Sequence, residues 1–368
     1  MQYRAISTDS HVNEPLDLWQ KRLPQSMRAK GYRIVECEDG GQGWTVEDRK
    51  PSSFGLGAVA GRSPEDFKER GIRFDDLLPG NWDPAAHLKD QDMDGVDASV
   101  IYPGAAMSVW NINDPELRKA CMRAYNEWLV EDFGAVDPKR IIGLAVLPVD
   151  DDIGEAVAEL ERSVKKGHRG GLIPTFPVRQ YTVAVYDPLW DAAEALDAPL
   201  HYHRGLGRRS PSSFTTGPGG AASVGGIVLR YFAAMDPLSY MMFGGVFHRH
   251  PNLKMVTAES DFGWIPFWSQ LCDDQWTRQR HWSKMELDKP PSEYIKQQVY
   301  ATFMDDEVGC QNLRHTGTST IMWASDYPHS VTTWPTSAEY IERQMKGVSP
   351  EDRHALLAGN AMRIYHLS

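Results

Sequence analysis

Side chains that bind metals or move protons follow four apolar runs of the sequence. They occur in the segments Asp9-Ser10-His11-Val12-Asn13-Glu14, His201-Tyr202-His203-Arg204, Glu259-Ser260-Asp261 and Ser325-Asp326-Tyr327-Pro328-His329. Side chains alternate along a strand, so Asp9 and His11 should point to one side, as should His201 and His203. Imidazole and carboxylate groups from different strands are typical ligands of a divalent cation. The pattern therefore indicates a metal site.

The elements that must position these groups form a repeating pattern. Eight short apolar runs are the candidate strands: Tyr3–Thr8, Ala98–Tyr102, Ile141–Pro148, Gly170–Ile173, Pro199–Tyr202, Lys254–Ala258, Gln297–Phe303 and Thr320–Ala324. Helical patterns separate them, for example Pro115–Phe133 after the N-cap residue Asp114, and Ile153–Lys166 with one apolar face. This alternation predicts a (β/α)₈ TIM barrel, in which catalytic groups lie at the carboxyl ends of the strands.

One segment interrupts the pattern. The first strand ends near Asp9 and the second begins near Ala98, and the residues between include a glycine-rich stretch, 39–43. We expect a single domain, residues 1–368, with residues 20–85 as an inserted, lid-like segment after strand one. Such insertions lie over the mouth of a barrel.

Composition limits the possible partners. The 368-residue chain has 39 Lys and Arg against 50 Asp and Glu, a net charge of −11. An acidic chain lacks the basic surface that nucleic acids require, so we expect a small-molecule substrate and no nucleic acid. No apolar stretch is long enough to span a membrane, and no signal peptide is visible. The four cysteines are widely spaced, as in a reduced protein. These features favour a cytoplasmic protein that does not contact membranes.

The motifs resemble those of the amidohydrolase superfamily, in the branch of aminocarboxymuconate-semialdehyde decarboxylase. The resemblance covers nearly the whole barrel and depends on Asp-Ser-His-Val-Asn-Glu-Pro, Pro-Leu-His-Tyr-His and Trp-Ala-Ser-Asp-Tyr-Pro-His. It implies that His203 and Asp326 bind the metal. Where the family has His-x-His in strand one, this chain has His11-Val12-Asn13, so Glu14, or Asp9 in the other register, completes the ligands. The catalytic histidine of strand six is replaced by Glu259.

The expected metal ligands are therefore His11, Glu14, His203, Glu259 and Asp326, around one or two divalent ions of Zn, Mn or Fe. The additional carboxylates favour Mn or Fe more than a site made only of histidines would. Glu259, Asp326 and His329 are the candidate catalytic groups, although His329 has a structural role as an alternative.

The substrate-binding candidates are Arg204, Trp264 and Trp334. Arg204 would bind a carboxylate and the tryptophans a flat or apolar group; a buried ion pair and simple packing are the alternative interpretations. We expect a homodimer.

Four functions remain open from the sequence. The first is a non-oxidative decarboxylase or another enzyme that cleaves a C–C bond of a small carboxylated substrate. The second is a hydrolase with a metal-activated water. The third is a binuclear non-haem iron oxygenase, and the fourth is a binding protein that has lost its metal. The fold alone does not distinguish them.

Overall fold

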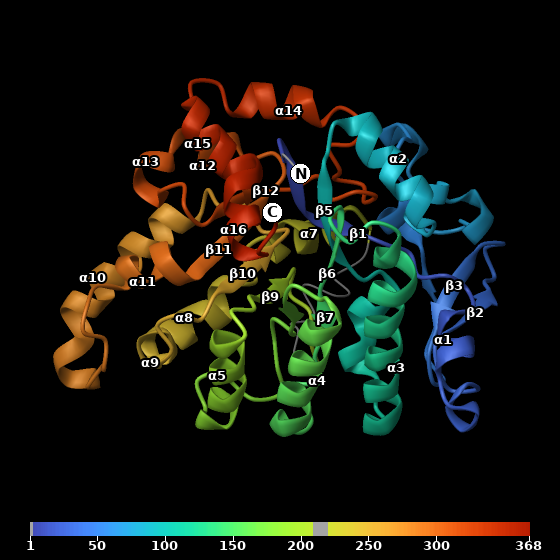
Figure 1. Ribbon diagram of the computed structural model, residues 1–368, viewed down its shortest axis with the longest axis horizontal. Coiled ribbons are helices and arrows are strands. Elements are labelled where there is room, and N and C mark those ends of the chain that lie inside the picture. Colours follow the sequence, from blue (N-terminus) through green and yellow to red (C-terminus); the bar gives the residue numbers. More distant parts are fainter. Residues whose placement is uncertain (1–2, 209–219) are drawn as a thin grey trace.

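Eight parallel strand positions form the centre of the molecule (Figure 1). The computed structural model describes residues 3–208 and 220–368. The barrel strands are β1 (Ile6–His11), β5 (Ala98–Tyr102), β6 (Ile141–Gly143) with β7 (Ala145–Val146), β8 (Gly171–Leu172), β9 (Leu200–His203), β10 (Met255–Ala258), β11 (Val299–Phe303) and β12 (Ile321–Trp323). Their residues are buried, as expected for parallel strands covered on both faces.

The strands close into a barrel at two junctions. Only Leu144 separates β6 from β7, so these two pieces share one position and join the β1-β5-β6 sheet to the β7–β12 sheet. At the other junction the Thr8 hydroxyl donates to the carbonyl of Trp323 (2.8 Å), and the Asp326 N–H donates to the carbonyl of Asp9 (2.9 Å). The expected (β/α)₈ barrel is thus confirmed.

Strand β1 differs from its prediction. It spans Ile6–His11 rather than Tyr3–Thr8, and its register against β5 shifts between Ser7 and Ser10. The sequence pattern placed the strand end at the first polar residues. Those residues are nevertheless part of the strand because they are buried at the mouth of the barrel, where they meet other polar groups.

Helices surround the barrel (Figure 1). They are α2 (Pro84–Asp94), α3 (Pro115–Trp128), α4 (Ile153–Lys166), α5 (Asp187–Ala195), α7 (Val224–Arg230), α8 (Met235–Phe243), α9 (Val246–Arg249), α10 (Ile265–Ser283), α11 (Pro291–Gln298), α12 (Glu307–Gln311), α13 (Leu313–Thr316), α14 (Ser337–Gln344), α15 (Pro350–His354) and α16 (Asn360–Ile364). Aspartates cap α2, α3 and α4 by accepting N–H groups of the first turn.

No helix in the described parts of the chain is long and apolar enough to cross a membrane.

The segment between β1 and α2 has its own small sheet. It contains α1 (Leu18–Arg22) and the antiparallel strands β2 (Arg33–Glu36), β3 (Gln42–Thr45) and β4 (Ser52–Ser53). Gly40 has φ 80° in the turn between β2 and β3, a conformation that glycine adopts without strain. The N–H groups of Val59 and Ala60 both donate to the carbonyl of Pro328 at 3.1 Å. This contact fixes the segment beside the loop that follows β12.

Candidate metal centre and active site

Five acidic and histidine side chains meet at the carboxyl ends of the strands. Asp9 and His11 come from β1 and His203 from β9, while Glu259 and Asp326 follow β10 and β12. All five are at most 2% exposed. The topology of a parallel barrel brings these strand ends together at one mouth.

The distances between their ligand atoms are short and similar. Nε2 of His11 lies 3.1 Å from Nε2 of His203, 3.3 Å from Oδ1 of Asp9 and 3.4 Å from Oδ1 of Asp326. Nε2 of His203 lies 3.6 Å from Oδ1 of Asp9. Ligand bonds of about 2.0–2.2 Å separate neighbouring donor atoms of one ion by roughly 3.3–3.6 Å in tetrahedral geometry. The cluster therefore has the dimensions of a shell around one divalent cation.

Glu259 lies at the edge of this cluster. Its Oε2 is 3.6 Å from Nε2 of His203, and its Oε1 contacts the guanidinium of Arg204. The same guanidinium lies over the ring of Tyr231, 4.9 Å from the centroid. The side chains of Glu259 and Arg204 thus form a buried ion pair beside the candidate ligands.

Several oxygens of the buried carboxylates lack hydrogen-bond partners. Both oxygens of Asp9 and Oδ1 of Asp326 have none among the described residues. Burying a carboxylate costs several kcal/mol unless a counter-charge is present. One arginine does not balance the three carboxylates of Asp9, Glu259 and Asp326, so the set of two imidazoles and several carboxylate oxygens fits a divalent cation.

The pKa values reflect the same excess of negative charge. Burial disfavours the charged form of His11, but the close contact with Asp9 and the charges of Asp9, Asp326 and Glu259 outweigh burial and raise the His11 pKa to about 9. Burial and the charge of Asp9 raise the pKa of Asp326 to about 7. Burial also raises the pKa of Glu259. The raised pKa values of His11, Asp326 and Glu259 favour the protonated forms of these three groups when no metal is bound.

Backbone geometry aims several of these side chains inward. Arg204, Glu259 and Asp326 have φ values of 38°, 50° and 52°. The left-handed region is unfavourable for residues other than glycine, and it is concentrated at functional sites. Each of these residues closely follows its strand, so the turn of the chain directs the side chain across the barrel mouth.

His329 stacks on His11, one of the candidate metal ligands. Its ring lies 3.9 Å from the ring of His11, centroid to centroid, and its Nδ1 forms a hydrogen bond of 3.2 Å with Oδ2 of Asp326. Burial and the neighbouring His11 lower the pKa of His329 to about 3. Its side chain is 20% exposed and borders the cavity, so it can reach a ligand.

A cavity of about 560 Å³ opens above the cluster. Its floor includes His11, His203, Glu259 and His329. The inserted segment contributes aromatic walls, Tyr32, Trp44 and Phe54, and the basic residues on the lining are Arg49, Lys50, Arg204 and Arg230. The volume lies in the range of small-molecule sites, roughly 300–1,000 Å³. The basic wall, in an acidic protein, favours an anionic ligand.

Glu14 does not lie among the candidate metal ligands at the barrel mouth. Its carboxylate accepts the backbone N–H groups of Gly104, Ala105 and Ala106 at 3.1, 2.8 and 3.1 Å. These bonds occupy both oxygens and hold the loop after β5. Asp9, the alternative from the other register, lies among the candidate ligands instead.

Trp264 and Trp334 lie away from the cavity. The indole N–H of Trp264 is bonded to the carbonyls of Ser260 and Asp261 at 3.1 and 3.2 Å, and that of Trp334 donates to the carbonyl of Asp90 at 2.9 Å. Neither side chain borders the space above the cluster. Their positions fit packing rather than the substrate contact expected from the sequence.

Sequence reasoning missed most of the cavity wall. Arg230 comes from α7, and Tyr32, Trp44 and Phe54 come from the inserted segment. No local motif marks these residues. Their position depends on the tertiary fold of residues 20–85.

Residues 76–367 match the family described as amidohydrolase. Two curated proteins are also similar in sequence. The chain is 28% identical to Decarboxylase orsB of Emericella nidulans over 272 residues, 68% of this chain and 77% of that protein. It is 25% identical to gamma-resorcylate decarboxylase of Polaromonas sp. over 289 residues, 75% of this chain and 85% of that protein.

Solved structures share the fold over the full length. An amidohydrolase from Mycobacterium avium subsp. paratuberculosis superposes with a TM-score of 0.82 at 22% identity, covering 99% of this chain and 100% of that one. A dihydroxybenzoic acid decarboxylase from Polaromonas sp., which contains manganese and the inhibitor 2-nitroresorcinol, superposes with a TM-score of 0.64 at 19% identity, covering 100% and 98%.

Proposed function

Because the chain belongs to the amidohydrolase family, we propose that it is a divalent-metal-dependent decarboxylase of small aromatic carboxylates. The observation that carries this proposal is the convergence of two histidines and three carboxylates beneath a cavity with basic and aromatic walls. The names of both curated relatives support the reaction, and the name of gamma-resorcylate decarboxylase supports the substrate class.

Asp9, His11, His203 and Asp326 are the residues that would hold the metal. Their oxygen-rich donor set suits manganese as well as zinc, and a structural neighbour contains manganese. A bound divalent cation supplies positive charge that attracts the substrate carboxylate and an adjacent oxygen. Glu259 is then an additional ligand or, through its ion pair, the group that orients Arg204.

The basic wall binds the anionic substrate. Arg204 is held in place by Glu259, so its remaining N–H groups can donate to a carboxylate. Arg230 and Lys50 border the same cavity. A charged hydrogen bond from one such group contributes about 1.5–3 kcal/mol to binding.

The reaction needs a proton at the carbon that loses CO₂. When the C–C bond breaks, its electron pair stays on the ring carbon, which then takes up one proton. His329 is positioned for this transfer, because its Nδ1 faces Asp326 and its ring borders the cavity. We assign Asp326 to holding the ring through Nδ1, and Nε2 of His329 to taking up a proton from solvent and delivering it to the ring carbon; the negative charges of Asp326 and of a bound substrate carboxylate favour the protonated ring in the complex.

The inserted segment covers the site in this proposal. Residues 20–85 supply Tyr32, Trp44 and Phe54 to the wall and are bonded to the loop after β12. A cover of this kind excludes water from the reacting carbon.

We also propose a cytoplasmic homodimer. The free cysteines, Cys37, Cys121, Cys272 and Cys310, support a reducing compartment. Exposed apolar side chains on and beside α7, at Val224, Val228, Leu229 and Phe232, support an interface there. Light scattering during size-exclusion chromatography tests the dimer.

A substrate panel tests the reaction. Protein treated with a chelator and then with Mn²⁺ or Zn²⁺ is incubated with 2,6-dihydroxybenzoate, with 5-carboxyvanillate, and with an ester and an amide of an aromatic acid. We expect one CO₂ for each phenol formed and no oxygen consumption. Oxygen uptake would instead indicate the iron oxygenase. Turnover of esters or amides without CO₂ release would indicate the hydrolase. If no compound is turned over, the result would favour the binding protein that has lost its metal.

A further inference from the structure

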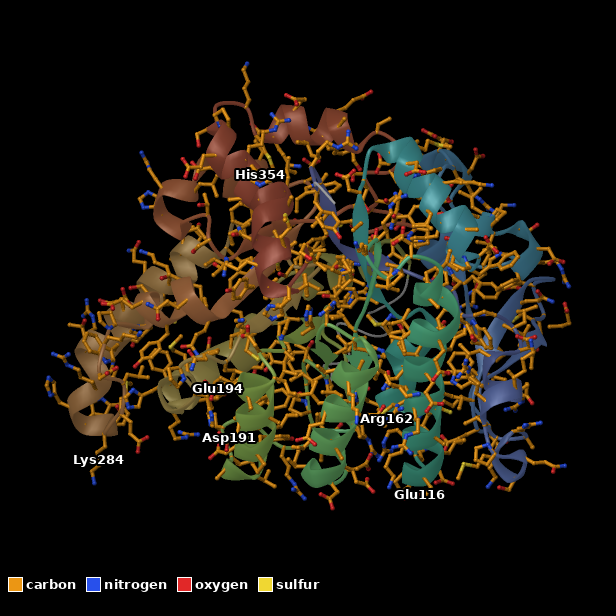
Figure 2. The ribbon with its side chains drawn as sticks, viewed as in Figure 1. Glu116, Arg162, Asp191, Glu194, Lys284 and His354 are labelled. Carbon is orange, nitrogen blue, oxygen red and sulfur yellow. The ribbon has the colours of Figure 1, made fainter. Side chains whose placement is uncertain are left out.

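A second group of side chains that could bind a metal lies at the end of the barrel opposite its mouth. Asp191 and Glu194 belong to α5, and His250 follows α9 on the loop that leads into β10. His250 is thus before the amino end of β10, whereas Glu259 follows its carboxyl end. Figure 2 shows Asp191 and Glu194 projecting from α5. We propose that Asp191, Glu194 and His250 bind a divalent transition-metal ion, Zn²⁺ or one of similar preference, at a site separate from the active site.

The donor atoms have the spacing of a zinc site. Nδ1 of His250 lies 3.2 Å from Oδ1 of Asp191 and 3.4 Å from Oε2 of Glu194. One ligand atom from each residue can be chosen so that all three lie within 4.8 Å of one another. Zinc bonds of about 2.0–2.2 Å place neighbouring tetrahedral ligands roughly 3.3–3.6 Å apart. Small side-chain adjustments therefore allow the three donors to share one ion.

His250 is buried without hydrogen bonds to its ring. The residue is 5% exposed, and neither ring nitrogen has a hydrogen-bond partner in the described parts of the chain. Buried polar groups are nearly always hydrogen-bonded, so this ring needs an explanation. Nδ1 faces two carboxylates at once, and a single N–H there can donate well to only one of them. One cation between the three groups satisfies all of them.

The backbone holds His250 in this position. Its N–H donates to the carbonyl of Val246 at 2.9 Å, and its carbonyl accepts the side-chain amide of Gln298 at 2.7 Å. The ring therefore reaches α5 from a fixed loop.

The two carboxylates are also arranged for binding. Asp191 and Glu194 are three residues apart and share one face of α5. Oε1 of Glu194 accepts the N–H of Asn252 at 2.6 Å, which leaves Oε2 for the ion. The Asp191 side chain is 71% exposed, so an ion can enter from solvent.

Charge favours a divalent ion here. Asp187 also approaches the ring, with Oδ1 3.5 Å from Nε2, but Oδ1 lies 3.4 Å from Nη2 of Arg249 as well. Asp187 and Arg249 therefore balance each other. Asp191 and Glu194 leave two negative charges beside a ring that is neutral when it binds a metal. One nitrogen and two oxygen ligands suit zinc better than calcium or magnesium, which prefer oxygen alone.

Zinc counting tests this site in the full-length protein. Chelator-treated protein is incubated with excess Zn²⁺, desalted and analysed by elemental mass spectrometry. We expect the wild type to retain one more zinc per chain than Asp191→Asn and Glu194→Gln. Glu161→Gln changes an exposed carboxylate of α4 and serves as the matched control, with the wild-type zinc content.

Thermal unfolding gives a second measurement. Without metal the variants should unfold within about 1 °C of the wild type, because the amides preserve shape. Zinc at about 100 times its dissociation constant should raise the melting temperature by roughly 3–5 °C through each intact site, so the zinc-induced rise should be smaller in Asp191→Asn and Glu194→Gln. Equal zinc content and equal zinc-induced stabilisation in wild type and both variants would overturn the proposal. His250 would then only form ion pairs with Asp191 and Glu194.

Discussion

Replacing Asp326 with asparagine should have opposite effects on the metal-free and the metal-bound protein. Asp326 is fully buried, and burial together with the charge of Asp9 raises its pKa from 3.8 to about 7. One pKa unit corresponds to about 1.36 kcal/mol, so the rise from 3.8 to about 7 means that the ionised carboxylate destabilises the metal-free fold by about 4 kcal/mol. An asparagine at this position removes the charge, preserves the shape and tolerates the φ value of 52°.

The sign of the pH effect follows from the raised pKa. The folded metal-free chain holds the Asp326 proton more tightly than the unfolded chain does, so its stability should fall as the pH rises from about 4 to about 7. The asparagine variant lacks this decrease. At pH 8 we expect its melting temperature without metal to exceed that of the wild type by about 4 °C or more.

Metal affinity should change in the other direction. Loss of a ligand should weaken metal binding by more than the 10–100-fold typical of residues that only support a ligand. Calorimetric unfolding with chelator and titration of the metal-free protein with Mn²⁺ measure the two effects.

Asp261→Asn is the matched control. Asp261 follows β10 and, like Asp326, has a positive φ, 49°. Burial and the charge of Asp306 raise its pKa to about 7, but Asp261 is not one of the candidate metal ligands. The Asp261→Asn variant should be more stable than the wild type at pH 8 and should bind metal with unchanged affinity. Unchanged metal affinity in Asp326→Asn would refute the ligand assignment, and a lower melting temperature without metal would refute the charge argument.

Three other substitutions separate the proposed roles. His329→Gln should lower kcat by about 10²-fold or more with full metal content, since it removes the proton donor; unchanged turnover would disprove that role. Glu259→Gln should retain metal and raise the substrate KM by about 10-fold because Arg204 loses its partner; elemental analysis showing lost metal would make Glu259 a ligand instead. Glu14→Gln should retain metal but destabilise the fold by about 1–3 kcal/mol, because an amide accepts fewer N–H bonds from residues 104–106; loss of metal in a folded protein would restore Glu14 as a ligand.

The sequence predicts the barrel and the general position of the site well. Eight apolar runs separated by helical patterns correspond to the observed strand positions, and strand ends must meet at one mouth. For this reason His11, His203, Glu259 and Asp326 could be placed together before any geometry was known.

The choice between Asp9 and Glu14 could not be made from spacing. It depends on the shift of register between Ser7 and Ser10 and on the three N–H groups after β5 that bind Glu14. Both are tertiary features without a local sequence signal.

The tryptophans show a similar limit. Trp264 and Trp334 are close in sequence to strand ends, but the chain turns sharply after each strand. Residue Asp261, with its positive φ, lies three positions before Trp264, whose indole then bonds back to the turn. Closeness along the chain therefore did not determine the direction of these side chains.

The dependence of CO₂ release on metal tests the central claim most directly. Chelator-treated protein receives Mn²⁺ in steps, and ¹³CO₂ from carboxyl-labelled 2,6-dihydroxybenzoate is measured with the bound metal at each step. We expect no release without metal, a rise in proportion to bound metal in the wild type, and no comparable rise in Asp326→Asn. Equal release with and without metal, or none from any aromatic carboxylate at full metal occupancy, would contradict a metal-dependent decarboxylase.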